Sequence, residues 1–144
     1  MIHFVTASKD STIYLQQPDQ NTGRDEILEV SKVYYGNVKD ISRALIYFDL
    51  QSISESIHAG NISLESVDLI LREAESITSK EIPIDFTLYA YPLSQSWDMG
   101  LGTRFDEISS DGVTWNQRGN GLDWLEGDYV ADTTGSINGR GGVW

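Results

Sequence analysis

Apolar and polar residues alternate with a period of two along much of the chain. The clearest run covers residues 42–50, in which Ala44, Ile46, Phe48 and Leu50 share one set of alternate positions. A period of two is typical of a β-strand with one face toward a core. We therefore expect the Ala44 side of this strand to face the core. The other candidate strands are residues 2–6, 12–15, 27–35, 67–72 and 84–91.

Turn signals separate these strands, and only one segment favours a helix. The turn signals lie at residues 20–23, 35–37 and 59–61. They follow one another too closely for crossover helices between the strands. In the segment from Ser52 to Ala59, Ser52 suits an N-cap and Gly60 suits a terminator. The sequence predicts an all-β fold, an antiparallel β-sandwich with one short helix near residues 53–59.

The last third of the chain, residues 98–144, differs from the rest. Ten of the thirteen glycines and all four tryptophans fall at or after Trp97, and no long alternating run follows Tyr91. We expect a single domain over residues 1–144 whose Gly/Trp-rich end is dominated by loops. A long irregular segment in a compact domain indicates functional loops or a chain that stops before its last strands.

Charge and composition exclude several classes of function. The chain has 22 acidic and 10 basic residues, a net charge of −12, and no cysteine. Such a charge repels a phosphate backbone, so we expect no nucleic-acid partner. Disulfides and thiolate metal sites are excluded. No apolar run is long enough to span a membrane, and the start lacks the pattern of a secretion signal, so we expect synthesis in the cytoplasm without export.

The acidic residues suggest two kinds of site, neither of which we expect. Asp106 with Glu107, or Asp123 with Glu126 and Asp128, could be the acid and base of a glycosidase. A chain this acidic has close pairs by chance, so we expect no enzyme. Loops rich in Asp and Asn also suit calcium, but no segment has the spacing of a helix–loop–helix calcium site. Structural calcium stays open as an alternative, and no other cofactor is expected.

The four tryptophans allow two interpretations. Trp97 and Trp115 are followed by turn-forming polar residues, and we expect them to pack at the ends of the sandwich. Trp124 and Trp144 are less constrained. They either pack or offer the flat faces on which a sugar ring stacks in a carbohydrate-binding module.

The expected outer side of the strands is too apolar for a surface that simply meets water. It carries Leu45, Tyr47, Ile70, Tyr89 and Tyr91. Tyrosine is typical of interface cores. We expect this side to be covered by a second sheet, by further residues of the same chain, or by a neighbouring subunit. The candidate subunit-interface residues are Tyr47, Ile70, Tyr89 and Tyr91.

Five motifs follow one another between residues 8 and 118. They are the strand Asp10–Tyr14, the triplet Asn21-Thr22-Gly23 with Ile27–Val30, the strand Arg43–Leu50 ending in Phe-Asp-Leu, the run Ile53–Ile57 with Val67–Leu71, and the segment Leu88–Pro92 with Trp97 and Val113–Asn116. This order resembles the DNRLRE-type modules, also known as disaggregatase-related or alginate-binding-type modules. The resemblance implies a jelly-roll-like β-sandwich. The closing strands usual in that family have no counterpart here, so we expect either an amino-terminal portion of a longer product or a partner that supplies them.

The segment Gln17–Val30 is also similar to small structural proteins of tailed bacteriophages, especially those of marine and cyanobacterial hosts. This likeness implies a non-enzymatic virion component of the tail, neck or fibre, with other virion proteins and copies of itself as partners. A cysteine-free chain without an export signal suits a particle assembled in the host cytoplasm. The alternative is a carbohydrate-binding module that recognises a host or matrix polysaccharide.

Overall fold

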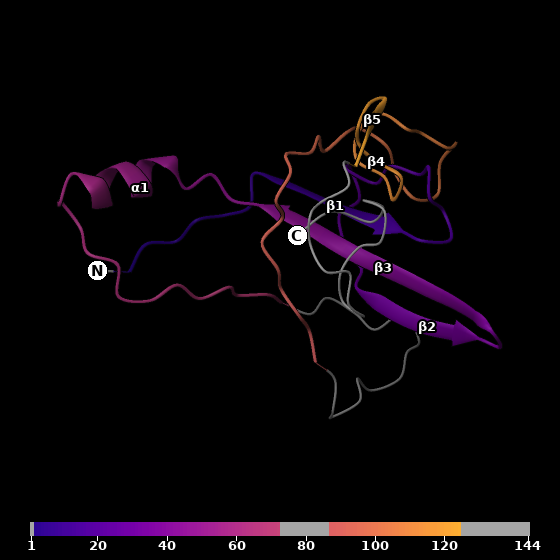
Figure 1. Cartoon of the computed structure of the whole chain (residues 1–144), viewed down its shortest axis with the longest axis horizontal. Helices are drawn as coiled ribbons and strands as arrows, with labels where there is room; N and C mark the ends of the chain where they lie inside the picture. Colours follow the sequence, from indigo (N-terminus) through magenta and orange to yellow (C-terminus); the bar gives the residue numbers. More distant parts are fainter. Residues whose placement is uncertain (1, 73–86, 125–144) are drawn as a thin grey trace. The chain divides into compact units, whose positions relative to one another are not determined.

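The structure is a computed structural model that describes residues 2–72 and 87–124. It is mostly β, with a three-stranded antiparallel sheet, a two-stranded sheet and one short helix (Figure 1). The described residues before Thr6 and from Asp49 to Ala90 form one unit, and the others form a second, larger unit. The predicted mostly β character is confirmed. The described residues show no closed or sandwich arrangement of the two sheets.

The three-stranded sheet belongs to the larger unit and has the order β1-β3-β2. Its strands are β1 (Lys9–Tyr14), β2 (Ser31–Tyr35) and β3 (Val38–Tyr47). The register pairs Tyr14 of β1 and Ser31 of β2 with the same residue, Ser42 of β3. The half of β3 after Ser42 therefore pairs with β1, and the half before it pairs with β2. The strands predicted at 12–15 and 42–50 are confirmed with shifted ends, and the one predicted at 27–35 begins only at Ser31.

A two-residue loop, Gly36-Asn37, joins β2 to β3. Gly36 has φ of +62°, which a residue with a Cβ adopts only at a cost. Positive φ at this position matches the primed turns whose twist suits a β-hairpin. The turn predicted at residues 35–37 is confirmed.

The core of the larger unit lies against one face of the sheet. It consists of Ile13, Leu45, Trp97, Val113, Trp115 and Trp124. Ile13 faces this core together with Leu45, because antiparallel partners share a face and Ile13 pairs with Arg43, two residues from Leu45. The predicted orientation of β3 was wrong. Leu45 is only 7% exposed, whereas Ala44 and Ile46 are half-buried.

The described part of the Gly/Trp-rich end is mostly irregular, as predicted. Its regular elements are the short strands β4 (Gln117–Gly119) and β5 (Leu122–Asp123), which pair with each other. Backbone hydrogen bonds join the preceding loops to this hairpin, from Asp98 N–H to Arg118 O and from Thr114 N–H to Gln117 O. The prediction for residues 125–144 falls outside the described part of the chain.

The smaller unit contains the helix α1 (Gln51–His58), close to the predicted position. Its N-cap is Leu50 instead of Ser52, and the side chain of Asp49 accepts a hydrogen bond from Gln51 N–H at 3.1 Å. Gly60, with φ of +71°, follows its end as expected. Among the described residues, no helix is long and apolar enough to cross a membrane.

Three predicted strands are not formed in the described residues. Residues 2–6, 67–72 and 87–91 belong to no strand, and 84–86 lie outside the described part. The alternating pattern sets which side chains share a face, but a strand also needs a neighbour for its backbone hydrogen bonds. Within the described ranges these segments have no such neighbouring strand.

Candidate functional site

The loop from Met99 to Val113 is held on the larger unit by the side chain of Asn21. Asn21 is completely buried. Its Nδ2 donates to the carbonyl oxygens of Met99 and Val113, both at 2.8 Å. Its Oδ1 accepts from the N–H groups of Gly102 at 2.8 Å and Gly23 at 3.2 Å. An amide side chain has two donor hydrogens and two acceptor lone pairs, so Asn21 is fully satisfied.

Glycines surround Asn21 because the backbone approaches it closely. A Cβ on Gly102 would lie 2.5 Å from the Asn21 carbonyl oxygen, and one on Gly112 would lie 2.9 Å from Asn21 Nδ2. Gly100 has φ of +78°, and a Cβ there would meet the carbonyl oxygen of Asp111 and the Asn21 amide. The sequence indicates the turn at residues 20–23 but not the arrangement of Asn21 with its four backbone partners, which we call the hub. Its only signal was the Asn-x-Gly triplet, because the other glycines reach Asn21 through the fold.

The same loop places Arg104 over the sheet. The Arg104 Cζ lies 4.5 Å from the centroid of the Tyr14 ring, and its guanidinium forms an ion pair with Glu29. The Arg104 N–H donates to the carboxylate of Asp25 at 3.1 Å. Burial first, and then the negative charge of Glu29, raise the pKa of the Tyr14 hydroxyl well above its ordinary value of 10.0. The cluster joins β1, the segment before β2 and the Met99–Val113 loop.

The raised pKa of Tyr14 predicts a loss of stability in alkali. Above pH 10 the Tyr14 hydroxyl ionises in the unfolded state but stays protonated in the folded state. The contribution of Tyr14 to the free energy of unfolding is therefore complete below pH 10 and is lost as the pH rises toward the folded pKa. We expect the free energy of unfolding to fall by about 1.4 kcal/mol between pH 9 and pH 11 in excess of the fall in Tyr14→Phe. Urea unfolding of both proteins across this range measures the difference. Parallel pH profiles would contradict it.

A cavity of about 230 Å³ opens beside this cluster. It is lined by Gln16, Gln17, Pro18, Asp19, Gln20, Arg104, Asp106 and Ile108. Its carboxylates already have partners, since Asn116 Nδ2 donates to Asp19 at 2.7 Å and the Thr103 hydroxyl donates to Asp106 at 2.6 Å. Pockets for drug-sized ligands usually exceed about 300 Å³. The cavity therefore suits a small polar group, such as part of a sugar or of a peptide.

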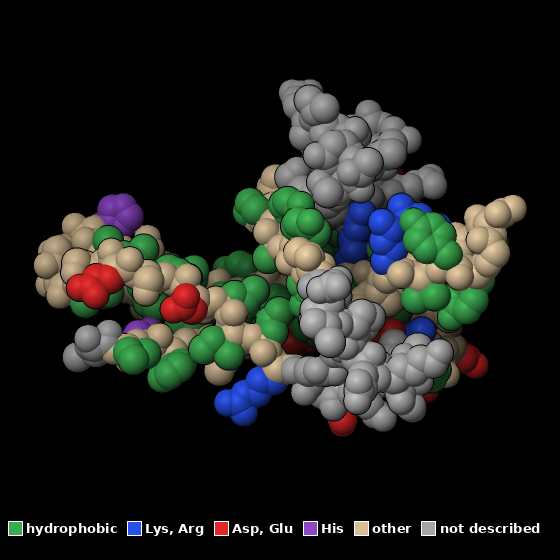
Figure 2. Space-filling model, turned by 90° about the horizontal axis from the view of Figure 1, so that it is seen from below, with side chains coloured by type: hydrophobic (Ala, Val, Ile, Leu, Met, Phe, Trp, Pro, Cys, Tyr) green, Lys and Arg blue, Asp and Glu red, His purple; other side chains and the backbone are tan. Residues whose placement is uncertain are grey.

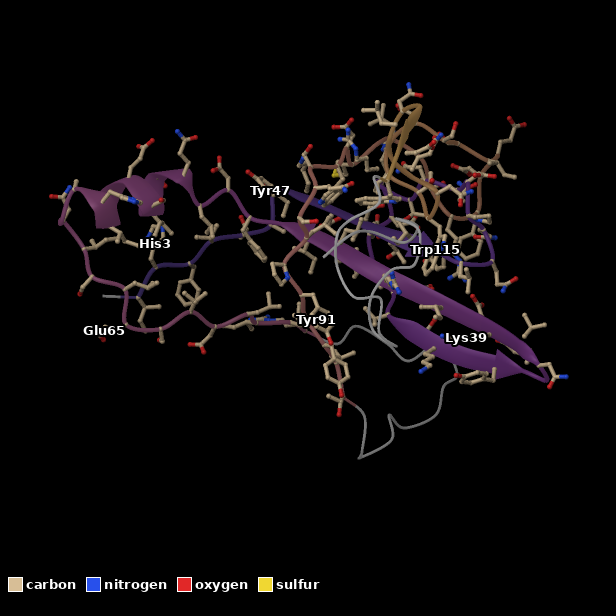
Figure 3. The ribbon with its side chains drawn as sticks, in the orientation of Figure 1. His3, Lys39, Tyr47, Glu65, Tyr91 and Trp115 are labelled. Carbon is tan, nitrogen blue, oxygen red and sulfur yellow. The ribbon has the colours of Figure 1, made fainter. Side chains whose placement is uncertain are left out.

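The predicted subunit-interface residues are all exposed, but they belong to different units. Tyr47 ends β3, and the Lys9 ammonium lies 5.0 Å from the centroid of its ring. Tyr47 and Tyr91, labelled in Figure 3, belong to the larger unit, and Ile70 and Tyr89 belong to the smaller one. Their role at an interface stays a prediction.

Three of the tryptophans are buried in the core of the larger unit. Trp97 and Trp115 pack there as expected, and the Arg43 Cζ lies 4.8 Å from the centroid of the Trp115 ring. Trp124 is also buried, and its indole N–H donates to the Thr114 carbonyl at 3.1 Å. This placement favours the packing alternative for Trp124. Trp144, the second candidate for sugar stacking, lies outside the described residues.

The acidic residues considered as catalytic or metal-binding form no described cluster. Asp106, Glu107 and Asp123 are exposed, whereas Glu126 and Asp128 lie outside the described residues. In the ranges that the structure describes, no three His, Asp or Glu side chains are grouped so that they could hold a metal ion.

The tip of the β2–β3 hairpin is a further exposed apolar surface, which the sequence pattern does not indicate. Tyr34, Tyr35 and Val38 are each more than half exposed, and Val33 is partly exposed. We call residues 31–40 the arm. The sequence identified a strand and a turn here, but an alternating pattern does not show whether a second layer covers the strand.

Comparisons with family models, with curated proteins and with solved structures find no match to this chain. The resemblance to the DNRLRE-type modules therefore stays a prediction from the motifs, and the function has to be argued from the surface and the site.

Proposed function

We propose that this protein is a non-enzymatic structural component of a tailed-bacteriophage virion that binds neighbouring subunits in the tail, neck or fibre. The observation that carries the proposal is the balance of apolar side chains. Among the described residues, 23 large hydrophobic side chains are exposed and 7 hydrophobic residues are buried. Figure 2 shows apolar side chains on the face in view. A protein that acts alone rarely leaves so much apolar surface in water, and large exposed patches mark interaction sites.

The strand-like segment at residues 67–72, which belongs to no strand in the described part of the chain, supports the same proposal. Residues 67–72 alternate as a strand would, and Val67, Leu69 and Ile70 are exposed. Covering such side chains contributes about 25 cal/mol for each Å² of apolar area removed from water. We propose that this segment completes a jelly-roll-like sandwich of the DNRLRE type when a neighbouring subunit pairs with it.

Charge and composition fit a particle assembled in the host cytoplasm. A net charge of −12 keeps free subunits soluble and keeps them off the genome during packaging. The absence of cysteine means that assembly needs no disulfide. The partners we propose are other virion proteins and further copies of this chain.

Tyr89→Asp tests the proposal. Tyr89 is 71% exposed, so a carboxylate there should leave the free chain folded but place a charge in a desolvated contact. In particles assembled with tagged chains, we expect mass spectrometry to find the variant at least about tenfold depleted relative to wild type.

Phe105→Asp is the matched control. Phe105 is 90% exposed and lies outside the predicted interface, so its variant should enter particles normally. Circular dichroism of both free chains checks that they fold alike. Normal incorporation of Tyr89→Asp, or absence of the wild-type chain from purified particles, would count against a virion role.

The alternative, a carbohydrate-binding module, is supported by the cavity beside Arg104. Three glutamines and Arg104 line it, and amide and guanidinium groups suit sugar hydroxyls. The Gln16 and Gln20 amide nitrogens already donate to backbone carbonyls, so Gln17 is the glutamine chosen for the test. Trp124 gives this alternative no support, because its ring is packed in the core. A glycan array distinguishes the two functions. If the protein binds a specific glycan and Gln17→Ala abolishes this binding, the carbohydrate-binding module is favoured. If the protein binds no glycan on the array, the assembly role is favoured.

A further inference from the structure

The arm extends beyond the part of the sheet that β1 supports. β1 pairs with β3 as a strand only from Ser42 onward, so the earlier residues of β3 have β2 as their one strand partner among the described residues. Just after β1, two single hydrogen bonds reach this half, from Leu15 N–H to the Ile41 carbonyl at 2.9 Å and from Gln16 Nε2 to the Lys39 carbonyl at 3.1 Å. Figure 1 shows β2 and this half of β3 continuing past the end of β1. The outer edge of β2 has no strand partner among the described residues. A two-stranded hairpin is only marginally stable in water unless something covers it, and an open edge can pair with another chain.

Both faces of the arm carry exposed apolar side chains. Antiparallel partners share a face, so Tyr35 lies with Val38, and Tyr34 lies with Lys39. Tyr34 is 61% exposed and Tyr35 is 69% exposed. Figure 3 shows Lys39 on this hairpin. Tyrosines in such positions supply large contact areas with little loss of side-chain entropy.

The charge of the arm identifies its partner. The arm contains two lysines, Lys32 and Lys39, and one acidic residue, Asp40, so its net charge is +1, whereas the whole chain carries −12. A basic, tyrosine-bearing segment on an acidic protein is complementary to the rest of that protein. The arm extends away from β1 within its own chain. The acidic side chains that complement its lysines are therefore offered by a second copy of the chain.

We propose that the arm docks on a second copy of this chain. Tyr34 and Tyr35 supply the buried contact, the free edge of β2 accepts backbone hydrogen bonds, and the two lysines meet carboxylates of the other copy. This inference deepens the proposed function, because it names one contact between copies, but the contact forms between free chains as well.

Analytical ultracentrifugation of the whole chain tests the inference. We expect a concentration-dependent dimer that weakens as NaCl rises from roughly 0.05 to 0.5 M, because salt screens the lysine contacts. Tyr34→Ser and Tyr35→Ser should each raise the dissociation constant at least about tenfold. Lys32→Glu should weaken the dimer and abolish most of its salt dependence.

Two controls match these changes outside the arm. Phe105→Ser removes an aromatic ring that is even more exposed than those of Tyr34 and Tyr35, and Arg24→Glu makes the same change of charge as Lys32→Glu at an exposed site. Both should dimerise like wild type. A monomer at every concentration, a dimer that the arm variants leave unchanged, or a dimer that the controls weaken equally would overturn the inference.

The outcomes separate this inference from the virion role. A monomeric wild-type chain that still enters particles would refute the arm contact and leave the virion role standing. If the chain forms a dimer that depends on the arm but is absent from every particle, the arm contact stands and the virion role is refuted.

Discussion

Asn21→Ala is expected to lower the free energy of unfolding by roughly 4 kcal/mol or more, or to prevent the larger unit from folding. The substitution leaves four backbone groups without their Asn21 partner, namely the buried carbonyl of Val113, the buried N–H groups of Gly23 and Gly102, and the half-buried carbonyl of Met99. Each such group costs about 1–3 kcal/mol unless water reaches it. Urea unfolding followed by tryptophan fluorescence measures the loss, since the tryptophans of the core report on this unit.

Two further variants show whether hydrogen bonding is the cause. Asn116→Ala removes an amide that donates to Asp19 at an exposed site, so it should cost no more than about 1 kcal/mol. Asn21→Asp keeps the shape but directs a carboxylate at two carbonyl oxygens. Burial and these dipoles raise the folded pKa of that carboxyl above its unfolded value near 4. The free energy of unfolding of Asn21→Asp should therefore lie furthest below that of Asn21→Ala at neutral pH, and this difference should shrink as the pH falls. If Asn21→Ala and Asn116→Ala lowered the free energy of unfolding equally, the buried hydrogen bonds of Asn21 would not be a main source of stability.

The hub matters for the candidate site because it fixes the loop that carries Arg104. The Asn21 N–H also donates to the Ser109 carbonyl at 2.7 Å, so Asn21 holds the loop on both sides of Arg104. Without this anchor, Arg104 loses its position over Tyr14 and beside the cavity. We infer that the buried amide is a positioning residue for the polar cavity, although it does not line the cavity itself.

The apolar pattern located β1 and β3, and the Gly-Asn turn signal located the turn before β3, but the strand predicted at residues 27–35 begins only at Ser31. Residues 27–30 are mostly apolar and fall in the strand predicted at 27–35, yet Glu29 N–H donates to the side-chain hydroxyl of Thr12 at 3.0 Å instead of to the backbone of a neighbouring strand. A side-chain acceptor can replace the backbone hydrogen bonds between strands in this way, and no pattern of apolar residues reveals such an acceptor.

The face of β3 that meets the core was not predictable from β3 alone. Both faces carry apolar side chains, and the more uniformly apolar one, with Ala44, Ile46 and Phe48, suggested the core. The loops decide instead, because Trp97 and Trp115 pack on the side of Leu45. These tryptophans are more than 50 residues away in sequence, so only the tertiary fold reveals which face they cover.

Gly100→Ala is expected to destabilise the larger unit by at least about 3 kcal/mol, through two separable causes. The backbone of Gly100 has φ of +78°, where any residue with a Cβ is strained by about 1–2 kcal/mol. In addition, the new methyl group would overlap the Asp111 carbonyl oxygen and lie 2.5 Å from Asn21 Oδ1, so the hub must open to admit it. Urea unfolding followed by tryptophan fluorescence gives the total loss.

Gly121→Ala separates the two causes, because Gly121 has a similar φ of +69° but nothing within 4 Å of the added Cβ. It should therefore cost only the backbone strain, about 1–2 kcal/mol. Gly36→Ala, with φ of +62° and open space in the arm, is a second control of the same kind. The difference between Gly100→Ala and these controls measures how tightly the loop closes on Asn21. If all three variants lose the same stability, the close packing around Asn21 contributes nothing, and the glycine at position 100 is required only by its backbone conformation.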